Sequence, residues 1–158
     1  MKHLYATDRA GYVKCTTRDG IEYEIKCENV THRNVGWKLS ILWNVATFGN
    51  VKRYAIDDPE GKTIHSSLVV RGKAKFPFMK EKDIEIGPCE TDPAYRGKNI
   101  YPYVLSYIIE KELDDEGVAY MIVEDSNTPS IRGITKAGFK PTGDVITVNL
   151  LKQYNIEK

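Results

Sequence analysis

The sequence predicts a single α/β domain in which a mixed β-sheet is covered by helices on its faces. The first half of the chain contains several short segments that are typical of strands and turns, and the second half alternates strands with helices. A run of strands followed by such an alternation favours a mixed sheet. The length of 158 residues suits one domain, and the 41% of hydrophobic residues is ordinary for a globular protein.

Strand patterns dominate the first half of the chain. Residues 21–28 alternate apolar and charged side chains after the turn signal Asp19-Gly20, which predicts a half-buried strand. Residues 52–56 and 63–70 flank Asp58-Pro59-Glu60-Gly61, where proline and glycine occupy the positions that a type I turn prefers. These two segments are therefore predicted to form a hairpin.

Residues 35–48 have the composition of a helix, with Gly49 as its C-terminal cap. Apolar side chains cover more than one of its faces, so we expect a mostly buried helix that either belongs to the core or lines a pocket. Because this segment is apolar, the protein could be either a monomer or a homodimer. The basic stretch over residues 71–82 is interpreted as a solvated loop.

The second half is predicted to contain a strand at 83–89, a helix at 101–116, a strand at 118–124, a helix at 129–137 and a strand at 144–151. The first of these helices has apolar residues at helical spacing and begins with Pro102 in its first turn. The second helix follows the capping residues Asn127 and Thr128 and ends before Gly138.

Charge and composition argue against several classes of partner. The chain has 23 Lys and Arg against 22 Asp and Glu, so it lacks the basic surplus that binds nucleic acid non-specifically. It shows no signal-peptide pattern at its start and no apolar run of membrane-spanning length, so we expect a cytoplasmic protein without a membrane partner. Three irregularly spaced cysteines predict reduced thiols and no metal site.

Residues 84–101 read as a strand, a short loop with Gly97, and the start of a helix. The first N–H groups of a helix have no partner within it, and a glycine lets a phosphate approach the backbone closely. This segment is a candidate pyrophosphate site. An ordinary turn between a strand and a helix would have a similar sequence.

Two motifs here resemble those of the GNAT superfamily of acyl-CoA-dependent N-acyltransferases. Residues 96–101, Arg-Gly-Lys-Asn-Ile-Tyr, are similar to the phosphate loop Arg/Gln-x-x-Gly-x-Gly/Ala, although Asn99 and Tyr101 stand where the family usually has glycine or alanine. Asn127, a helix, and Gly138-Phe139 match the second motif. The resemblance covers residues 83–145 and implies a mostly antiparallel central sheet with helices on both faces.

The resemblance implies an N-acetyltransferase that moves an acetyl group from acetyl-CoA to a primary amine in a ternary complex, without a metal. Acyl-CoA would lie where two central strands separate, and the acceptor amine is not identified by any motif. The implied cofactor-binding residues are Cys89, Glu90, Thr91, Arg96, Gly97, Lys98, Asn99, Ile100, Tyr101, Asn127 and Ser130. The alternatives are a non-catalytic acyl-CoA-binding module and an unrelated α/β domain that binds another phosphate ligand.

An amine acceptor is mostly protonated near neutral pH, so the reaction needs a general base. The candidates are Glu85, Asp83 and Glu90, of which Glu85 is preferred, and each could instead be a solvated strand residue. Many family members have a tyrosine as the general acid at the position of Ile134. Tyr120 is either a substitute for that acid or a core residue.

The strand before the phosphate loop contains Gly87, Pro88 and Cys89. Proline cannot donate to a sheet ladder, so Pro88 marks either the separation of two strands or a bulge of no functional meaning. Gly87 would allow a thioester to approach closely. Cys89 could carry an acyl group, but a small hydrophobic role is favoured, because no histidine is related to it in the sequence.

Overall fold

A computed structural model describes residues 1–47, 49–73, 76–149 and 153–157, with the side chains of residues 32, 37 and 39 outside the description. Parts of three predicted elements lie outside the described residues. They are Phe48 of the helix predicted at 35–48, residues 74–75 of the loop at 71–82, and residues 150–151 of the strand at 144–151. No helix in the described ranges is both long and apolar enough to span a bilayer.

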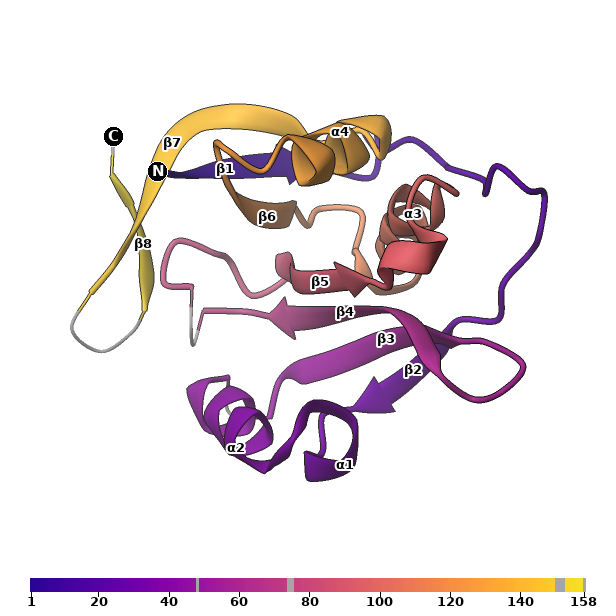
Figure 1. The fold of residues 1–158 in the computed structure, drawn as a ribbon. Coiled ribbons are helices and arrows are strands. Elements are labelled where there is room, and N and C mark those ends of the chain that lie inside the picture. Colours follow the sequence, from indigo (N-terminus) through magenta and orange to yellow (C-terminus); the bar gives the residue numbers. More distant parts are fainter. Residues whose placement is uncertain (48, 74–75, 150–152, 158) are drawn as a thin grey trace.

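Eight strands of the described chain form one curved sheet in the order β2-β3-β4-β5-β6-β1-β7-β8 (Figure 1). Neighbouring strands are antiparallel except for β5 and β6, which are parallel, so the predicted mixed and mostly antiparallel sheet is confirmed. The strands are β1 Lys2–Thr7, β2 Lys26–Asn29, β3 Val51–Asp57, β4 Thr63–Arg71, β5 Ile84–Thr91, β6 Ala119–Glu124, β7 Lys140–Val148 and β8 Tyr154–Glu157.

Helices lie on both faces of the sheet, as predicted. On one face, α3 (Ile100–Glu112) and α4 (Thr128–Lys136) bury their apolar residues against the sheet, and on the other α2 (Trp37–Ala46) covers a smaller cluster. Successive side chains of β4 point to opposite faces of the sheet. Val69 packs in the cluster under α3 and α4, and its neighbours Leu68 and Val70 pack in the cluster under α2. Two short helices, α1 (His32–Val35) and η1 (Pro93–Tyr95), complete the described elements.

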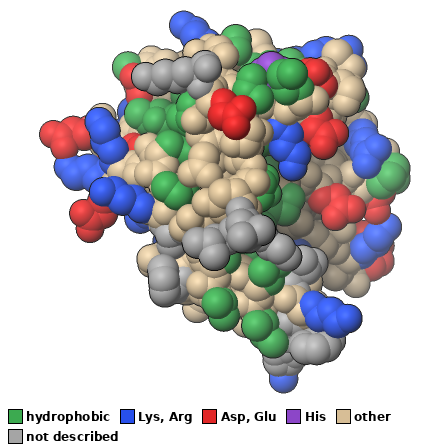
Figure 2. All heavy atoms as spheres, turned by 90° about the vertical axis from the view of Figure 1, so that its left-hand side faces the viewer, with side chains coloured by type: hydrophobic (Ala, Val, Ile, Leu, Met, Phe, Trp, Pro, Cys, Tyr) green, Lys and Arg blue, Asp and Glu red, His purple; other side chains and the backbone are tan. Residues whose placement is uncertain are grey.

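Two sequence predictions in the first half are wrong. Of the strand predicted at 21–28, only the end forms β2, and Ile21 is exposed. Residues 35–48 do not form one buried helix, because Gly36, with a φ of 82°, separates α1 from α2. Ile41, Leu42 and Val45 are 56%, 46% and 70% exposed. Figure 2, which views the side of the molecule where α2 lies, shows hydrophobic side chains on this part of the surface.

The remaining predicted elements agree with the structure, with shifted ends. The hairpin of β3 and β4 is confirmed, and the strand and helix alternation from β5 to β7 is present. The helix predicted at 101–116 ends at Glu112, and the strand predicted at 144–151 begins already at Lys140. β1 and β8 were not predicted.

β1 lies between β6 and β7, and residues 8–25 connect it to β2 at the far end of the sheet. This connection runs along α3 (Figure 1). Its backbone is fixed there, since the N–H of Cys15 donates to Ser106 Oγ at 3.1 Å and the N–H of Arg18 donates to the carbonyl of Lys98 at 2.9 Å. The N-terminal connection therefore reaches the loop that the sequence analysis singled out.

β5 and β6 separate soon after they begin to pair. Their parallel register joins Ile84 to Ala119 and Glu85 to Tyr120, and no further pair between them occurs in the described sheet. On its other side β5 has an irregularity opposite β4, where Gly87 and Pro88 lie between the pairs Val69 to Ile86 and Ser67 to Cys89. Pro88 thus lies in an irregular part of β5, next to the place where β5 and β6 separate.

Candidate cofactor and active site

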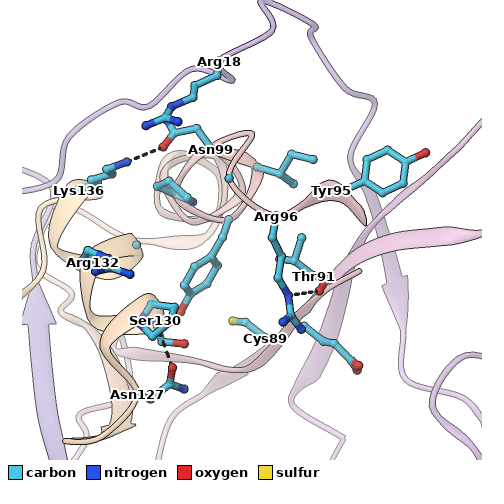
Figure 3. A pocket seen from close by; sticks show the side chains of 17 residues that line it. Arg18, Cys89, Thr91, Tyr95, Arg96, Asn99, Asn127, Ser130, Arg132 and Lys136 are labelled. Carbon is cyan, nitrogen blue, oxygen red and sulfur yellow. Dashed lines mark hydrogen bonds between the residues drawn. The ribbon is translucent and has the colours of Figure 1, made fainter. Parts of the chain in front are cut away.

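A cavity of about 520 Å³ opens at the end of β5, between the N-termini of α3 and α4 (Figure 3). It brings together nearly all residues that the family resemblance implied for the cofactor: Cys89, Glu90, Thr91, Arg96, Gly97, Asn99, Ile100, Tyr101, Asn127 and Ser130. Lys98 is outside the lining and holds its ammonium 4.7 Å from the centre of the Tyr95 ring. The two motifs, far apart in the sequence, thus face one cavity.

The loop before α3 has a defined backbone shape. Asp92 caps η1 by accepting a hydrogen bond from the N–H of Ala94 at 2.9 Å, and Arg96 Nε donates to the carbonyl of Thr91 at 3.1 Å. Asn99, the N-cap of α3, has a φ of 67°. This left-handed conformation explains why asparagine can replace the usual glycine there. The loop therefore keeps the backbone turn despite the changed residue.

Four cationic side chains line the cavity, namely Arg18, Arg96, Arg132 and Lys136 (Figure 3). Among the lining residues of the described chain, Glu90 alone carries a carboxylate. Both helix N-termini add partial positive charge, and the first turn of α3 adds N–H groups, although Pro102 supplies none. In α4 the N–H groups of Thr128 and Ser130 are already bonded to Ser126 and Asn127. The cavity is therefore suited to a phosphate-bearing anion.

Sequence reasoning missed Arg18, Arg132 and Lys136 as lining residues. Arg18 arrives from the connection along α3, where Asn99 Nδ2 also donates to the carbonyl of Thr16 at 2.6 Å. Lys136 Nζ lies 3.3 Å from Asn99 Oδ1, across the cavity wall (Figure 3). No local pattern around Arg18 indicates this position, because it depends on the path of the whole N-terminal segment.

The N-terminus of α4 forms the opposite wall. Asn127 is its N-cap, and its Oδ1 accepts a hydrogen bond from the N–H of Ser130 at 3.3 Å (Figure 3). Ile134, at the position of the family's tyrosine, is fully buried in the core between α4 and the sheet. Tyr120 packs on the opposite face of the sheet, with its ring centre 5.5 Å from that of Phe78. Neither side chain lines the cavity.

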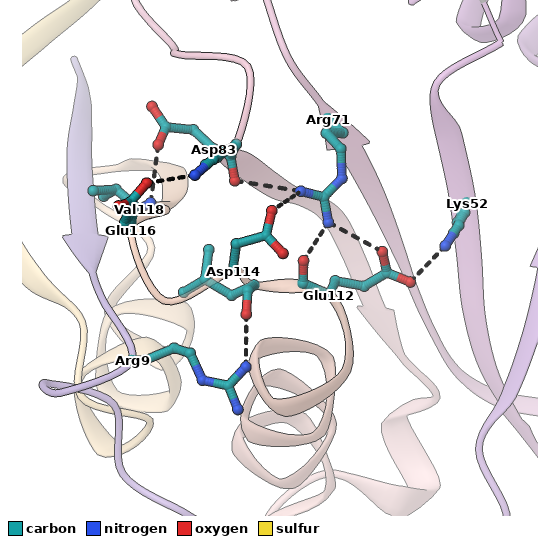
Figure 4. Close-up of polar contacts among 10 residues, drawn as sticks. Arg9, Lys52, Arg71, Asp83, Glu112, Asp114, Glu116 and Val118 are labelled. Carbon is teal, nitrogen blue, oxygen red and sulfur yellow. Dashed lines mark hydrogen bonds and ion pairs between the residues drawn. The ribbon is translucent and has the colours of Figure 1, made fainter.

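The three candidate bases lie in different environments. Asp83 is 1% exposed and does not line the cavity. Its carboxylate accepts hydrogen bonds from the N–H of Lys80 and from the N–H of Val118, the second of which is drawn in Figure 4. Glu85 is buried beneath Gly87, with Oε1 3.0 Å from the place that a Cβ on residue 87 would take. Glu90 is exposed and lines the cavity. The structure thus places only Glu90 in the lining.

Cys89 faces the inner end of the cavity. Burial, with a smaller contribution from the Glu85 carboxylate, raises the pKa of its thiol to about 12, although hydrogen bonds with Ser67 and Tyr101 act in the opposite direction. At neutral pH the sulfur therefore remains protonated. Because the thiolate is the nucleophilic form, this environment argues against Cys89 as an acyl carrier.

A buried histidine beside the cavity was also missed by sequence reasoning. His65 is 1% exposed, and its Nδ1 and Nε2 lie 2.8 Å from Thr91 Oγ1 and 2.9 Å from Ser67 Oγ. Burial lowers the pKa of His65 to about 4, so the ring is neutral at physiological pH. The spacing of His65 and Ser67 on β4 puts both on one face of the strand, which was the available signal.

No protein-family model and no curated protein matches the sequence. Several solved structures share the fold. An acetyltransferase of the GNAT family from Colwellia psychrerythraea aligns over 89% of this chain and 52% of its own, with 12% identity and a TM-score of 0.62. An acetyltransferase assigned to the GNAT family from Bordetella pertussis aligns over 90% of this chain and 97% of its own, with 14% identity and a TM-score of 0.58.

A third similar structure is a tandem GNAT protein from the clavulanic acid biosynthesis pathway, which has 12% identity and a TM-score of 0.58 and aligns over 89% of this chain and 50% of its own. The chain thus spans about half the length of the first and the third of these proteins. The agreement in fold, together with the sheet described above, defines the class of structure. This domain has the fold of the GNAT acetyltransferases.

Proposed function

We propose that this domain is an acyl-CoA-dependent N-acyltransferase that transfers an acetyl group from acetyl-CoA to a primary amine by direct attack in a ternary complex. The observation that carries the proposal is the cationic cavity between the N-termini of α3 and α4, at the place where β5 and β6 separate. A GNAT fold makes acyl transfer the natural chemistry for such a cavity. The cytoplasmic location, the monomer or homodimer, and the absence of nucleic-acid and membrane partners stay predictions.

The N-terminus of α3 and the loop before it would hold the pyrophosphate of acetyl-CoA. The backbone from Gly97 to Tyr101 supplies N–H donors, and Arg96 and Arg18 supply charge nearby. Asn127 and Ser130 face the cavity from α4 and would contact the arm that joins the nucleotide to the acyl group. Backbone of β5 near Cys89 would polarise the thioester carbonyl.

The reaction requires that the amine lose a proton before its nitrogen attacks the carbonyl carbon. A C–N bond then forms, the C–S bond breaks, and the sulfur leaves as a thiolate, which a thiol pKa near 8.5 makes tolerable without a dedicated acid. For the base we retain Glu85 and Glu90. We withdraw Asp83, because both of its oxygens accept backbone hydrogen bonds outside the cavity.

A non-catalytic acyl-CoA-binding module is the alternative, favoured by one observation. Ile134 is buried at the position where the family's acid stands, and neither it nor Tyr120 lines the cavity. Tight binding of CoA without release of thiol from acetyl-CoA, over a broad panel of primary amines, would identify such a module.

The first test is calorimetric titration of the protein with acetyl-CoA and with CoA. A variant with Arg96→Ala and Asn127→Ala should bind both at least tenfold more weakly, because it loses a charge and a polar contact at opposite walls of the cavity. Lys111→Ala, in the last turn of α3 and outside the cavity lining, is the matched control and should bind as the wild type does. Absence of binding to the wild type would overturn the proposal.

A screen of primary amines with detection of released CoA thiol would follow. The variants Glu85→Gln and Glu90→Gln test the two candidate bases, because glutamine keeps the shape of glutamate but cannot accept the proton. The variant that lowers kcat while leaving the affinity for acetyl-CoA unchanged identifies the base. If neither changes the rate, the proton leaves by another route, such as ordered water.

A further inference from the structure

The side chain of Tyr101 lines the cavity. It leaves the first turn of α3 and lies against β4, β5, β6 and α4. Its hydroxyl lies 4.0 Å from Met121 Sδ on β6 and interacts with the thiol of Cys89 on β5. One side chain thus bridges the two strands beyond the point where their own pairing ends.

The ring of Tyr101 is packed against the backbone of α4. A Cβ on Gly133 would lie 2.5 Å from Cδ1 and 2.8 Å from Cε1 of the tyrosine, distances that real contacts do not reach. Any residue larger than glycine at position 133 would therefore collide with the ring. The fourth neighbour is His65, whose ring centre lies 6.0 Å from that of Tyr101 at an interplanar angle of 35°.

These contacts hold the ring across the space between β5, β6 and α4. Cys89, Tyr101 and Gly133 all belong to the cavity lining, so the ring forms part of the cavity wall between β5, β6 and α4. A ligand whose phosphates lie at the helix N-termini and whose chain points between the strands would meet this wall. The ring of Tyr101 would therefore limit the length of the acyl chain that fits.

We propose that Tyr101 is a specificity-determining residue that limits the acyl group to a short chain by closing the gap between β5 and β6. This inference rests on the proposed acyl-CoA function. It adds the substrate class: acetyl-CoA and similarly short thioesters are accepted, and thioesters with chains of about four or more carbons are excluded because their methylene groups would overlap the ring.

Replacing the ring by a methyl group would leave an apolar space of about the size of phenol, bounded by Met121, Cys89 and the backbone of Gly133. Such a space favours an alkyl chain over water. Each methylene that enters it should tighten binding about threefold to fourfold, which corresponds to about 0.8 kcal/mol per buried methylene.

The test is calorimetric titration of wild type, Tyr101→Ala and Tyr101→Phe with CoA, acetyl-CoA, butyryl-CoA and hexanoyl-CoA. Wild type and Tyr101→Phe, which keeps the ring, should bind hexanoyl-CoA at least tenfold more weakly than acetyl-CoA. Tyr101→Ala should reverse this order and bind hexanoyl-CoA at least tenfold more tightly than acetyl-CoA. Tyr101→Leu should give an intermediate order, and it serves as the folded replacement if the alanine variant does not fold.

Three results would overturn the inference. If the chain-length order is the same in wild type and in the smaller variants, Tyr101 does not set the length, although the acyl-CoA function stands. If a smaller variant binds CoA and the wild type does not, the ring excludes the whole arm rather than the longer chains. If no variant binds any of the four ligands, the proposed function fails, and the inference fails with it.

Discussion

The carboxylate of Asp83 accepts a hydrogen bond from the backbone N–H of Val118 at 2.9 Å. Its other oxygen accepts from the N–H of Lys80 at 2.7 Å, so that one side chain ties the turn before β5 to the start of β6. The parallel pairing of these strands begins at the adjacent residues Ile84 and Ala119. Asp83 thus fixes the register of the only parallel pair in the described sheet.

The variant Asp83→Ala should lower the free energy of unfolding by about 1–3 kcal/mol, because two partly buried N–H groups lose a charged acceptor. Urea unfolding measures this change. Asp115→Ala is the control, since the side chain of Asp115 is 94% exposed and its ion pair with Arg9 should contribute less than about 1 kcal/mol. A lower kcat at unchanged acetyl-CoA affinity, without a loss of stability in Asp83→Ala, would restore Asp83 as a candidate base.

The parts of the fold that could be predicted are those with local signals. The hairpin of β3 and β4 has its turn residues in the sequence, and α3 has apolar side chains at helical spacing. Residues 21–25 alternate as a strand would, yet they run along α3, where the Tyr103 hydroxyl donates to the carbonyl of Tyr23 at 3.2 Å. Tertiary contact overrode the local pattern there.

The site divides in the same way. The loop at 96–101 and Asn127 belong to contiguous motifs, and residues of both line one cavity in the structure. Arg18 could not be predicted, because its position depends on where β1 enters the sheet and how the chain returns across α3. For His65 the sequence offers only its spacing to Ser67 on β4, and its contact with Thr91 follows from the pairing of β4 with β5.

The buried ring of His65 should make stability depend on pH. Its pKa is about 4 in the folded protein and near 6.5 when unfolded, so the unfolded chain binds a proton first as the pH falls. Stability from this group is complete above pH 6.5 and decreases between pH 6.5 and 4, by about 3 kcal/mol in total. Urea unfolding at several pH values measures the slope.

The variant His65→Gln is the comparison for this measurement, because glutamine can still bond to Thr91 or Ser67 but does not titrate. It should be less stable than wild type at pH 7 and lose less stability between pH 6.5 and 4. Carboxylates whose pKa is lowered by a partner, such as Asp57 beside Lys26, also lose their contribution to stability as the pH falls. They do so at lower pH, and in both proteins. Parallel profiles for the two proteins would contradict this assignment to His65.

The contact between Gly133 and Tyr101 predicts a pair of coupled substitutions. Gly133→Ala should destabilise the protein by about 1–3 kcal/mol, since the added methyl would overlap the tyrosine ring. In the Tyr101→Ala background the same substitution should cost less than about 0.5 kcal/mol, or stabilise α4, because alanine favours helix over glycine. A double-mutant cycle in urea unfolding measures the coupling, and additive effects would show that the two residues do not share this space.

The cationic lining predicts that ligand binding weakens with salt. Arg18 lies at the cavity but comes from the connection along α3, so Arg18→Ala removes a charge without changing the phosphate loop itself. We expect CoA to bind this variant about threefold to tenfold more weakly at low ionic strength. The difference should shrink at 0.5 M salt, where the Debye length is roughly 4 Å instead of roughly 14 Å at 0.05 M.

Dephospho-CoA, which lacks the ribose phosphate and keeps the pyrophosphate, tests which phosphate of CoA Arg18 contacts. If Arg18 contacts the ribose phosphate, Arg18→Ala and wild type should bind dephospho-CoA equally well, and Arg96→Ala should weaken both ligands, because Arg96 lies in the loop that leads into α3. Lys111→Ala controls for the loss of a positive charge elsewhere on the same helix. An Arg18→Ala variant that binds CoA like wild type at 0.05 M salt would exclude this arginine from the binding site.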